Sequence, residues 1–575
     1  MASFSSALII VSSHTPIPRT KISEIKKINL KITPTSFPTA PKFTTSQCHK
    51  IVSKPQETFS YLSTQPVIAD ESCLENSEVV EVFKQILGKV GADSFECLTM
   101  IDAVQRLGID NYFVRQNEEV LGKKYALFCE NGLLGRNLYK AALSFRLLRQ
   151  HSYQVPAGIF NVFKDGKGRF KHELSTDITG LLELYEASQL SIEGEDILDE
   201  AREFSAQHLK AWEEKLNHSH ARFVKNTLDH PYHKSQSRVM VSNLLANLQG
   251  CTNEWMCALQ GLAMRDFNLV HSLHRQEILQ FSEWWNNLGL GKELEFVRDQ
   301  PVKWHIWSLA CLADPSLSEE RIELTKPVSL IFVIDDIFDV KGSLEELTLF
   351  TEVINRWDYA AIERLPGYMK ICFKALHEIT NEISHKVYQK HGWNPVDSLR
   401  KTWVNLCNAF LVEAKWFASG EQPNPDEYLR NGIISSGVQI LLVHVFFLLG
   451  QGLTKENVKV IDNNPGIISS VATILRLWDD LGSAKDENQE GHDGSYVHFY
   501  IKEHQGVREE EARNHVNQMI SKAWKQLNQE CLFPNPFSSS FKNASLNFAR
   551  MLPFLYSYDE NQRLPSLEDY MKSLL

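Results

Sequence analysis

The sequence predicts an all-α protein. After about residue 75 the chain has helical periodicity and little strand alternation, and residues 201–215 and 507–527 mix apolar and charged positions at helical spacing. Helix-forming residues dominate these segments, whereas Gly and Pro lie mostly between them. We find no internal repeat of a solenoid period. The 575 residues are therefore expected to form two large helical domains.

The overall composition is that of a globular protein. Hydrophobic residues make up 43% and charged residues 23%, close to the average for soluble domains, which excludes a disordered chain, a collagen-like repeat and a coiled coil. The 60 basic and 71 acidic residues give a net charge of −11. This argues against a nucleic-acid partner, because a protein that binds nucleic acid needs a basic surface. The ten cysteines are scattered without a CxxC pair, so we expect neither a zinc site nor a disulfide framework.

The first fifty residues differ from the rest of the chain. Residues 1–50 contain fifteen Ser or Thr, seven Lys or Arg, and a single acidic residue, Glu24. A hydroxylated, basic and acid-poor leader is typical of an organelle transit peptide. The alternative is a disordered tail that has no targeting function. Arg19 is the only arginine among these residues. This favours a plastid over a mitochondrion, so we expect the protein in the chloroplast stroma.

The remainder divides into residues 55–262 and residues 263–575. A weaker pattern over 227–242, which includes Pro231, predicts a loop near the end of the first part. In the second part, the apolar run 440–449 is about half of the ~20 residues that a bilayer requires. The run also contains His444. It therefore predicts a buried helix, and no membrane span is expected.

An acidic cluster follows the apolar run 330–334. Asp335 and Asp339 lie four residues apart, with Asp336 between them, and on a helix the outer two are about one turn apart on the same face. Stacked carboxylates suit hard divalent cations, which prefer oxygen ligands. A solvated acidic turn is the alternative, but the apolar residues before the cluster favour a position at the mouth of a buried site.

A second cluster lies 144 residues downstream. Asp479, Ser483 and Glu487 are spaced four residues apart, which on a helix makes a ridge roughly 12 Å long. Two carboxylates and a hydroxyl on one ridge can share one Mg²⁺. The two clusters together predict two helices that face each other across a cavity.

Arginines and aromatic residues complete the pattern. Arg298 precedes Asp335 by 37 residues, and Arg476 lies just before Asp479; a guanidinium beside carboxylate-bound metal is suited to a phosphate. Between the two clusters and beyond them lie apolar and aromatic residues: Trp304, Trp307, the run 440–449, Tyr556 and Tyr558. Aromatic rings under a diphosphate can stabilise a carbocation, by ~1–2 kcal/mol each in a dry site.

Three of these motifs resemble those of the plant terpene synthases, class I enzymes that ionise prenyl diphosphates. They are RDQ at 298–300, DDIFD at 335–339 and WDDLGSAKDE at 478–487. The likeness runs from about residue 60 to the C-terminus. It implies a C-terminal class I terpenoid synthase helical bundle that holds the site, and an N-terminal α-barrel-like domain without chemistry of its own. The DxDD motif of class II cyclases is absent from the sequence.

The resemblance also implies a role for each residue. Asp335 and Asp339 are expected to bind two Mg²⁺, and Asp479, Ser483 and Glu487 a third, with Mn²⁺ as a substitute metal. The expected diphosphate-binding residues are Arg298, Asp335, Asp339, Arg476 and Asp479. The expected catalytic residues are Asp335, Asp336, Asp339, Trp307 and Tyr556, of which Trp307 and Tyr556 would line the pocket.

Two departures from the family pattern restrict the class of product that we expect. The RRx8W motif of many cyclising monoterpene synthases is missing, because the chain has no Arg-Arg pair and no tryptophan before Trp212. The usual RxR is also changed, since Gln300 stands in place of the second arginine. RDQP at 298–301 and EGHDGSY at 490–496 are similar to the enzymes that make acyclic products, such as linalool and nerolidol synthases.

We therefore expect an enzyme that ionises geranyl diphosphate, and farnesyl diphosphate as well, and lets one water capture the cation to give linalool or nerolidol. Residues 435–437, at an expected helix break, are candidates to hold that water. The alternatives are an acyclic hydrocarbon synthase that makes ocimene, myrcene or farnesene by deprotonation, and a nerolidol synthase restricted to farnesyl diphosphate. The protein is expected to be a monomer whose only partner is its prenyl diphosphate substrate.

Three other readings of the acidic clusters remain open at this point. A prenyl-chain elongase would normally carry DDxxD in both clusters, unlike Ser483 and Glu487 here. A phosphatase of the haloacid dehalogenase type would need 330–334 to be a strand and an aspartate at the position of Ile337. A non-catalytic helical scaffold is the third alternative.

Overall fold

The computed structural model describes residues 70–90, 94–132, 136–236, 238, 241, 254–483, 494–556 and 571. Throughout these residues the regular elements are helices, and the one β-type contact is an isolated antiparallel bridge between Lys164 and Phe170. The predicted all-α class is confirmed. The transit peptide expected over 1–50 lies outside the described residues.

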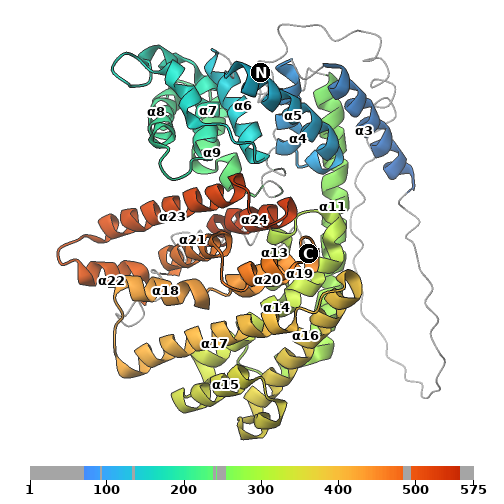
Figure 1. Ribbon diagram of the computed structural model, residues 1–575, viewed down its shortest axis with the longest axis vertical. Coiled ribbons are helices and arrows are strands. Elements are labelled where there is room, and N and C mark those ends of the chain that lie inside the picture. Colours follow the sequence, from blue (N-terminus) through green and yellow to red (C-terminus); the bar gives the residue numbers. More distant parts are fainter. Residues whose placement is uncertain are drawn as a thin grey trace, which may run out of the picture.

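The first part of the chain forms the smaller, upper lobe of Figure 1, coloured blue to green. Its helices are α3 (Asp70–Val90), α4 (Glu96–Arg106), η2 (Asp110–Phe113), α5 (Val114–Asn131), α6 (Leu138–Gln150), η3 (Ala157–Phe163), η4 (His172–Thr176), α7 (Ile178–Ser188), α8 (Asp196–Glu213), α9 (His218–Asp229) and η5 (Tyr232–Lys234). Their apolar faces enclose a core of their own.

The second part forms the larger, lower lobe. Its first helices are α11 (Glu254–Leu288), α12 (Leu290–Glu293), α13 (Pro301–Cys311), η6 (Pro315–Leu317), α14 (Ser318–Asp336), η7 (Ile337–Lys341), α15 (Leu344–Arg356), η8 (Tyr359–Arg364) and α16 (Gly367–His391). The remaining helices are α17 (Val396–Ser419), α18 (Pro425–Ser435), α19 (Val438–Leu449), α20 (Lys455–Ile461), α21 (Gly466–Ser483), α22 (Tyr496–Glu503), α23 (Glu509–Leu532) and α24 (Ser539–Leu555). Helices α23 and α24 lie next to the upper lobe (Figure 1).

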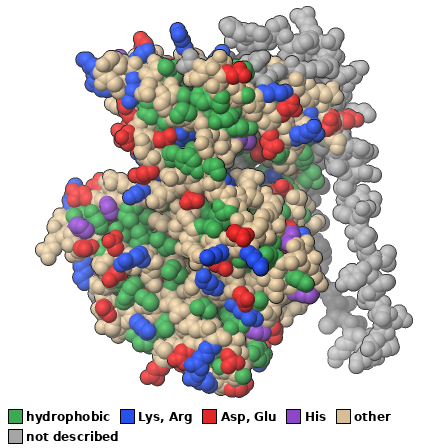
Figure 2. Space-filling view, in the orientation of Figure 1, with side chains coloured by type: hydrophobic (Ala, Val, Ile, Leu, Met, Phe, Trp, Pro, Cys, Tyr) green, Lys and Arg blue, Asp and Glu red, His purple; other side chains and the backbone are tan. Residues whose placement is uncertain are grey.

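Helix α11 belongs to both lobes. Trp255 and Leu259 near its start are buried in the upper core, whereas Phe281 and Trp285 near its end are buried in the lower core. The expected division between residues 262 and 263 therefore falls inside a continuous helix, and we propose it as a boundary between two cores rather than a break in the chain. The two lobes are separated by a notch at the left edge of Figure 2, where basic and acidic side chains are interspersed over the visible face.

Residues 227–236 are helical over much of their length, in place of the predicted loop. Helix α9 continues to Asp229, and η5 follows directly after Pro231. Tyr232 donates a hydrogen bond from its hydroxyl to the carbonyl of Gln105 (2.9 Å), and His233 is buried. The prediction of a loop is thus wrong for residues 227–234, because tertiary contacts order a stretch whose own pattern is weak.

The apolar run 440–449 is a buried helix, as predicted. Among the described residues, Pro425–Leu449 is the one stretch long and apolar enough to cross a membrane, but 78% of its most apolar window is buried inside the protein. The stretch is also interrupted between α18 and α19, where Gly437 has a φ of 72°. A left-handed residue of this kind ends a helix, and glycine adopts it without steric cost. The His444 ring lies against the Ile440 carbonyl (2.7 Å), and burial lowers the pKa of His444 to about 4.

A buried ion pair fixes the start of α14, the helix that carries the first acidic cluster. The guanidinium of Arg321 donates to Glu277 of α11 (2.6 Å) and to the Leu312 carbonyl at the end of α13 (2.8 Å). The same Glu277 contacts His305 of α13 (3.1 Å). Buried charges of this kind are costly unless fully paired. Their main effect is to hold α11, α13 and α14 in one relative position.

Candidate active site

One cavity opens between the helices of the lower lobe, with a volume of about 810 Å³. This is within the usual range for a site that encloses a small molecule. Its wall is built by side chains from α13, α14, η7, α17, α18, α19, α21, α22 and α24, and from the segments between them. Seven of the predicted site residues line it together: Arg298, Trp307, Asp335, Asp339, Arg476, Asp479 and Tyr556. Asp335 and Asp339 of the first acidic cluster and Asp479 of the second therefore face the same space.

The first acidic rim is formed where α14 ends. Asp335 lines the cavity, and its carboxylate is ion-paired with Arg298. Asp336 is buried behind this pair and does not line the cavity. Its carboxylate accepts from both the backbone N–H (2.8 Å) and the Nε (2.6 Å) of Arg298. Asp336 therefore holds the arginine, while Asp335 faces the cavity.

Asp339 is not on the α-helix that the sequence predicted. The helix changes at Ile337 into a π-helical turn, Ile337–Lys341, and Asp339 lies within it. Such single wide turns are frequent at functional sites. Asp339 still lines the cavity beside Asp335, so the expected pairing of the two carboxylates is reached through a different backbone geometry.

The second rim repeats the arrangement of the first. Asp479 lines the cavity, whereas Asp480 is buried and accepts from the Nε of Arg476 (3.0 Å), the hydroxyl of Tyr428 (2.8 Å) and the backbone N–H of Tyr496 (3.0 Å). Both side chains that face the cavity, Asp335 and Asp479, are 31% exposed. On each rim one aspartate is thus available to a ligand, and its neighbour positions an arginine.

Each arginine also lies over an aromatic ring. Arg298 is 5.4 Å from the ring centroid of Phe332, and Arg476 is 5.4 Å from that of Tyr428. Helix α18 leaves room for Arg476 because residue 432 is glycine. A Cβ atom there would lie 2.8 Å from Cδ and 2.9 Å from Cγ of the arginine. The position of this guanidinium therefore depends on a residue that the sequence analysis did not single out.

The carboxylates around the cavity destabilise one another's charged forms. Burial, helped by the nearby Asp335 and Glu413, raises the pKa of Asp339 to about 7. Burial likewise raises the pKa of Asp479 to about 6, although Arg476 opposes the change. The pKa of Asp335 and that of Glu413 are raised as well, mainly by burial. Together the rims concentrate more negative charge than the two arginines neutralise.

This donor set fits magnesium. Crowded carboxylate oxygens are the ligands of hard divalent cations, and a cation between them would remove the repulsion that raises their pKa values. No group of three His, Cys, Asp or Glu side chains among the described residues is close enough to hold a metal alone. Mg²⁺ commonly takes only one or two carboxylates and completes its octahedron with water and substrate phosphate, so a partly open set suits it.

Two of the predicted metal ligands cannot be placed. Helix α21 ends at Ser483, whose side chain is not described, and Glu487 lies outside the described residues. The expected ridge of three ligands is therefore seen only at Asp479. Tyr558 also lies outside the described residues.

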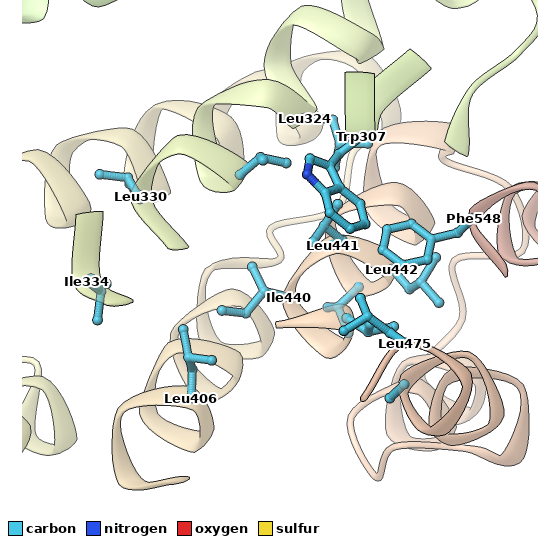
Figure 3. Packing of buried hydrophobic residues seen from close by; sticks show 14 of the residues in the cluster. Trp307, Leu324, Leu330, Ile334, Leu406, Ile440, Leu441, Leu442, Leu475 and Phe548 are labelled. Carbon is cyan, nitrogen blue, oxygen red and sulfur yellow. The ribbon is translucent and has the colours of Figure 1, made fainter. Parts of the chain in front are cut away.

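The floor of the cavity is aromatic and aliphatic. Trp307 of α13 packs against Phe548 of α24 with ring centroids 5.3 Å apart, and Tyr556 is 6.4 Å from Trp307. Leu441 of α19 and Leu475 of α21 lie close to the Trp307 and Phe548 rings in Figure 3. Trp304 is different: it is fully buried between Trp285 and Phe332 and does not line the cavity. Of the two tryptophans, only Trp307 can touch a ligand.

The break between α18 and α19 brings two hydroxyls to the cavity. Ser435 and Ser436 line it, just before Gly437. The Ser435 hydroxyl donates to the carboxylate of Glu413 on α17 (2.7 Å), and the same carboxylate accepts from the Asn431 amide (3.0 Å). The Ser435 proton is therefore engaged, and its oxygen is left as an acceptor toward the cavity.

Several lining residues were not found from the sequence. Lys303, Phe410, Glu413, Trp416 and Tyr428 all line the cavity. None of them lies in a motif, and their positions depend on how α13, α17 and α18 pack. Lys303 is the one of these residues that the sequence could have indicated, because it stands five residues after Arg298, at the start of α13.

The structure removes one of the open alternatives. Residues 330–334 belong to the helix α14 and not to a strand. A haloacid dehalogenase-type phosphatase needs its aspartate at the end of a strand, so this reading does not apply.

Comparison with known families agrees with the helical architecture and the acidic rims. Residues 286–526 match the family model described as the terpene synthase family, metal binding domain. Residues 47–228 match the terpene synthase N-terminal domain.

Similar proteins occur in several plants. A probable terpene synthase of Ricinus communis is 57% identical over 90% of this chain and 91% of its own length. An (E)-nerolidol synthase of Cannabis sativa is 53% identical (86% and 91% covered), and a chloroplastic S-(+)-linalool synthase of Arabidopsis thaliana is 49% identical (84% of each). A chloroplastic tricyclene synthase of Antirrhinum majus is 48% identical (84% and 84% covered). Relatives with different products therefore lie at similar distances.

A solved structure shares the fold. Isoprene synthase from grey poplar leaves, in complex with three Mg²⁺ ions and dimethylallyl-S-thiolodiphosphate, superposes with a TM-score of 0.81. It is 33% identical and covers 88% of this chain and 98% of its own.

Proposed function

This chain belongs to the plant terpene synthase family and is a lyase, and on that premise we propose that it converts geranyl diphosphate, and farnesyl diphosphate as well, to acyclic tertiary alcohols. One observation carries the proposal. Two acidic rims and two arginines meet above an aromatic floor in a single cavity of about 810 Å³. A diphosphate fits the charged end, and an isoprenoid chain fits the apolar end.

The charged end supplies the groups that ionisation requires. Asp335 and Asp339 on one rim, with Asp479, Ser483 and Glu487 on the other, would hold three Mg²⁺. When bound, magnesium withdraws negative charge from the diphosphate oxygens and makes diphosphate a better leaving group. The guanidinium groups of Arg298 and Arg476 donate hydrogen bonds to the same oxygens.

The apolar end controls the allylic cation. Trp307, Phe548 and Tyr556 exclude bulk water and present ring faces that stabilise positive charge. A water that donates a hydrogen bond to the Ser435 oxygen would lie at the edge of this apolar space. Attack by the oxygen of that water on the tertiary carbon forms the C–O bond, and loss of one proton leaves linalool or nerolidol.

The acyclic product rests on sequence features, namely Gln300 at the altered RxR and the missing RRx8W. The nerolidol and linalool synthases among the relatives support it, whereas the tricyclene synthase marks the alternative of ring closure. Loss of a proton instead of water capture would give ocimene, myrcene or farnesene. Use of farnesyl diphosphate alone is a narrower version of the same proposal.

Plastid location is part of the proposal. It is supported by the composition of residues 1–50 and by relatives that are described as chloroplastic. We also propose that the protein acts as a monomer, because a single chain supplies all the described residues that line the cavity.

Product analysis tests the proposed function. The protein is incubated with Mg²⁺ and with either geranyl or farnesyl diphosphate, and volatiles are identified by mass spectrometry. We expect linalool and nerolidol, respectively, with their hydroxyl oxygen labelled when the reaction is run in H₂¹⁸O. Cyclic products or unlabelled hydrocarbons would refute water capture, and no turnover of either substrate would refute the proposed reaction.

A further inference from the structure

A third cation lines the cavity besides the two predicted arginines. It is Lys303, in the first turn of α13. Arg298, Lys303 and Arg476 are the lysines and arginines that face this space among the described residues. Lys303 is half-buried.

The three cations differ in what holds them. Arg298 is paired with Asp335 and Asp336, and Arg476 with Asp480. Within the part of the chain that the structure describes, no hydrogen bond or ion pair is formed by the Lys303 ammonium. An ammonium has three donors and no acceptor, so all three of its N–H groups remain available to a ligand in the cavity.

The surroundings of Lys303 disfavour an isolated positive charge. The first turn of a helix carries the positive end of the helix dipole, where acidic residues are stabilising and basic ones are not. Burial and the neighbouring guanidinium of Arg298 lower the pKa of Lys303, and only the Asp479 carboxylate opposes them. A positive charge kept at this point costs stability unless an anion compensates it.

The family pattern points to the anion. In the RxR motif of the plant terpene synthases a second arginine stands two residues after the first, where this chain has Gln300. Gln300 is exposed at the N-terminal cap of α13 and does not line the cavity. Lys303, one helical turn further on, does line the cavity. Both the Arg298 guanidinium and the Asp479 carboxylate are near enough to affect its pKa.

We propose that Lys303 is a diphosphate-binding residue, which contacts the phosphate oxygens directly and supplies the positive charge that Gln300 lacks. This inference rests on the proposed function, because it takes the diphosphate to lie between the two rims. Lysine acts as a point charge rather than a planar fork, so it can stay in contact with the diphosphate as the C–O bond breaks and the leaving group gains charge.

Binding of inorganic pyrophosphate tests the inference without turnover. Full-length protein is titrated with pyrophosphate at saturating MgCl₂ in a calorimeter. Lys303→Met is expected to weaken binding about tenfold to a hundredfold, the range for a hydrogen bond to a charged group. Lys303→Arg should recover most of the affinity. The matched control is Lys292→Met, which removes an exposed lysine of α12 outside the cavity wall and should bind as the wild type does.

Thermal unfolding of each variant shows that it is folded, and Lys303→Gln provides a second neutral variant if the methionine perturbs packing. If the neutral variants bind pyrophosphate as tightly as the wild type, Lys303 is only a counter-ion of the acidic rims and the inference is overturned. It is also overturned if Lys292→Met weakens binding equally. A wild-type protein that neither binds Mg²⁺–pyrophosphate nor releases diphosphate would instead overturn the proposed function itself.

Discussion

Replacing Gly432 by alanine tests whether the position of one guanidinium limits the reaction. The new Cβ would lie 2.8 Å from Cδ and 2.9 Å from Cγ of Arg476, whereas carbon atoms in contact are normally about 3.5–4.0 Å apart. The arginine must therefore move by at least about 0.7 Å. Its Nε is held by Asp480 (3.0 Å), so the movement strains or breaks that contact.

The expected loss follows from the contact that we propose between Arg476 and the diphosphate. A hydrogen bond to a charged group is worth about 1.5–3 kcal/mol, which corresponds to a fall in kcat/KM of about tenfold to a hundredfold. Stability should change little, since alanine in a helix interior is about 1 kcal/mol better than glycine and offsets part of the strain. Steady-state release of diphosphate from geranyl diphosphate at saturating Mg²⁺ measures the first quantity, and thermal unfolding the second.

A matched control is Gly261→Ala in α11, where the nearest atom to the new Cβ is Nη1 of Arg265 at an ordinary 3.7 Å. It should leave kcat/KM unchanged. A double-mutant cycle with Arg476→Ala decides the cause, because the clash disappears when Cγ and Cδ are gone. If Gly432→Ala is as damaging in the Arg476→Ala background as in the wild type, the effect does not pass through the arginine and our reasoning is wrong.

Three further predictions concern the first acidic rim, the buried aspartates and the buried His233. Asp335→Ala should lower kcat by at least about a hundredfold, because metal-borne charge stabilisation is worth several kcal/mol; ordinary kcat would contradict its role as a ligand. Asp480→Asn should lower kcat/KM about tenfold to a hundredfold and also lower the thermal midpoint, as expected for a residue that orients a ligand-binding group; a loss of stability alone would show a purely structural role. Burial lowers the pKa of His233 to about 3. Below pH 6.5 this histidine therefore takes up a proton in the unfolded chain but not in the folded one. The free energy of unfolding should fall by about 2 kcal/mol between pH 7.5 and pH 5. His233→Gln should remove that share of the pH dependence in urea unfolding, and an unchanged difference between the two pH values would contradict it.

The fold could be predicted from the sequence because helical periodicity is a local signal. The buried helix around 440–449 and the facing acidic clusters needed only spacing and composition. The π-helical turn that carries Asp339 was not predictable in this way, since an α-helix and a π-helical turn bring residues four apart to nearly the same face. The segment 227–234 was also misjudged, because its order comes from contacts such as that between Tyr232 and Gln105, which lie far apart in sequence.

The same limit explains which site residues were missed. Glu413 meets Ser435 across two helices, and a single glutamate in a helical pattern normally predicts a solvated surface. In the sequence, Gly432 reads only as a residue that lowers the stability of α18. The structure shows that a side chain at this position would collide with Arg476. Trp304 and Trp307 could not be told apart as core and cavity residues, because one turn of α13 separates a side chain in the core from one at the cavity.

The two aspartate doublets can be explained by helix geometry. Consecutive residues of a helix point about 100° apart, so a doublet presents one carboxylate to the cavity and directs the next into the protein. On the first rim these are Asp335 and Asp336, and on the second Asp479 and Asp480. Asp335 and Asp479 are also paired with these arginines, but each keeps 31% of its side chain exposed, whereas Asp336 and Asp480 are almost completely buried. The buried aspartate fixes an arginine beside the carboxylate that faces the cavity, at the cost of its own desolvation, which the arginine and further hydrogen bonds offset. A glutamate at either buried position would carry its carboxylate about 1.5 Å further out and push the arginine toward the cavity. In this structure, helix geometry thus lets each aspartate pair present one carboxylate to the cavity and position an arginine with the other.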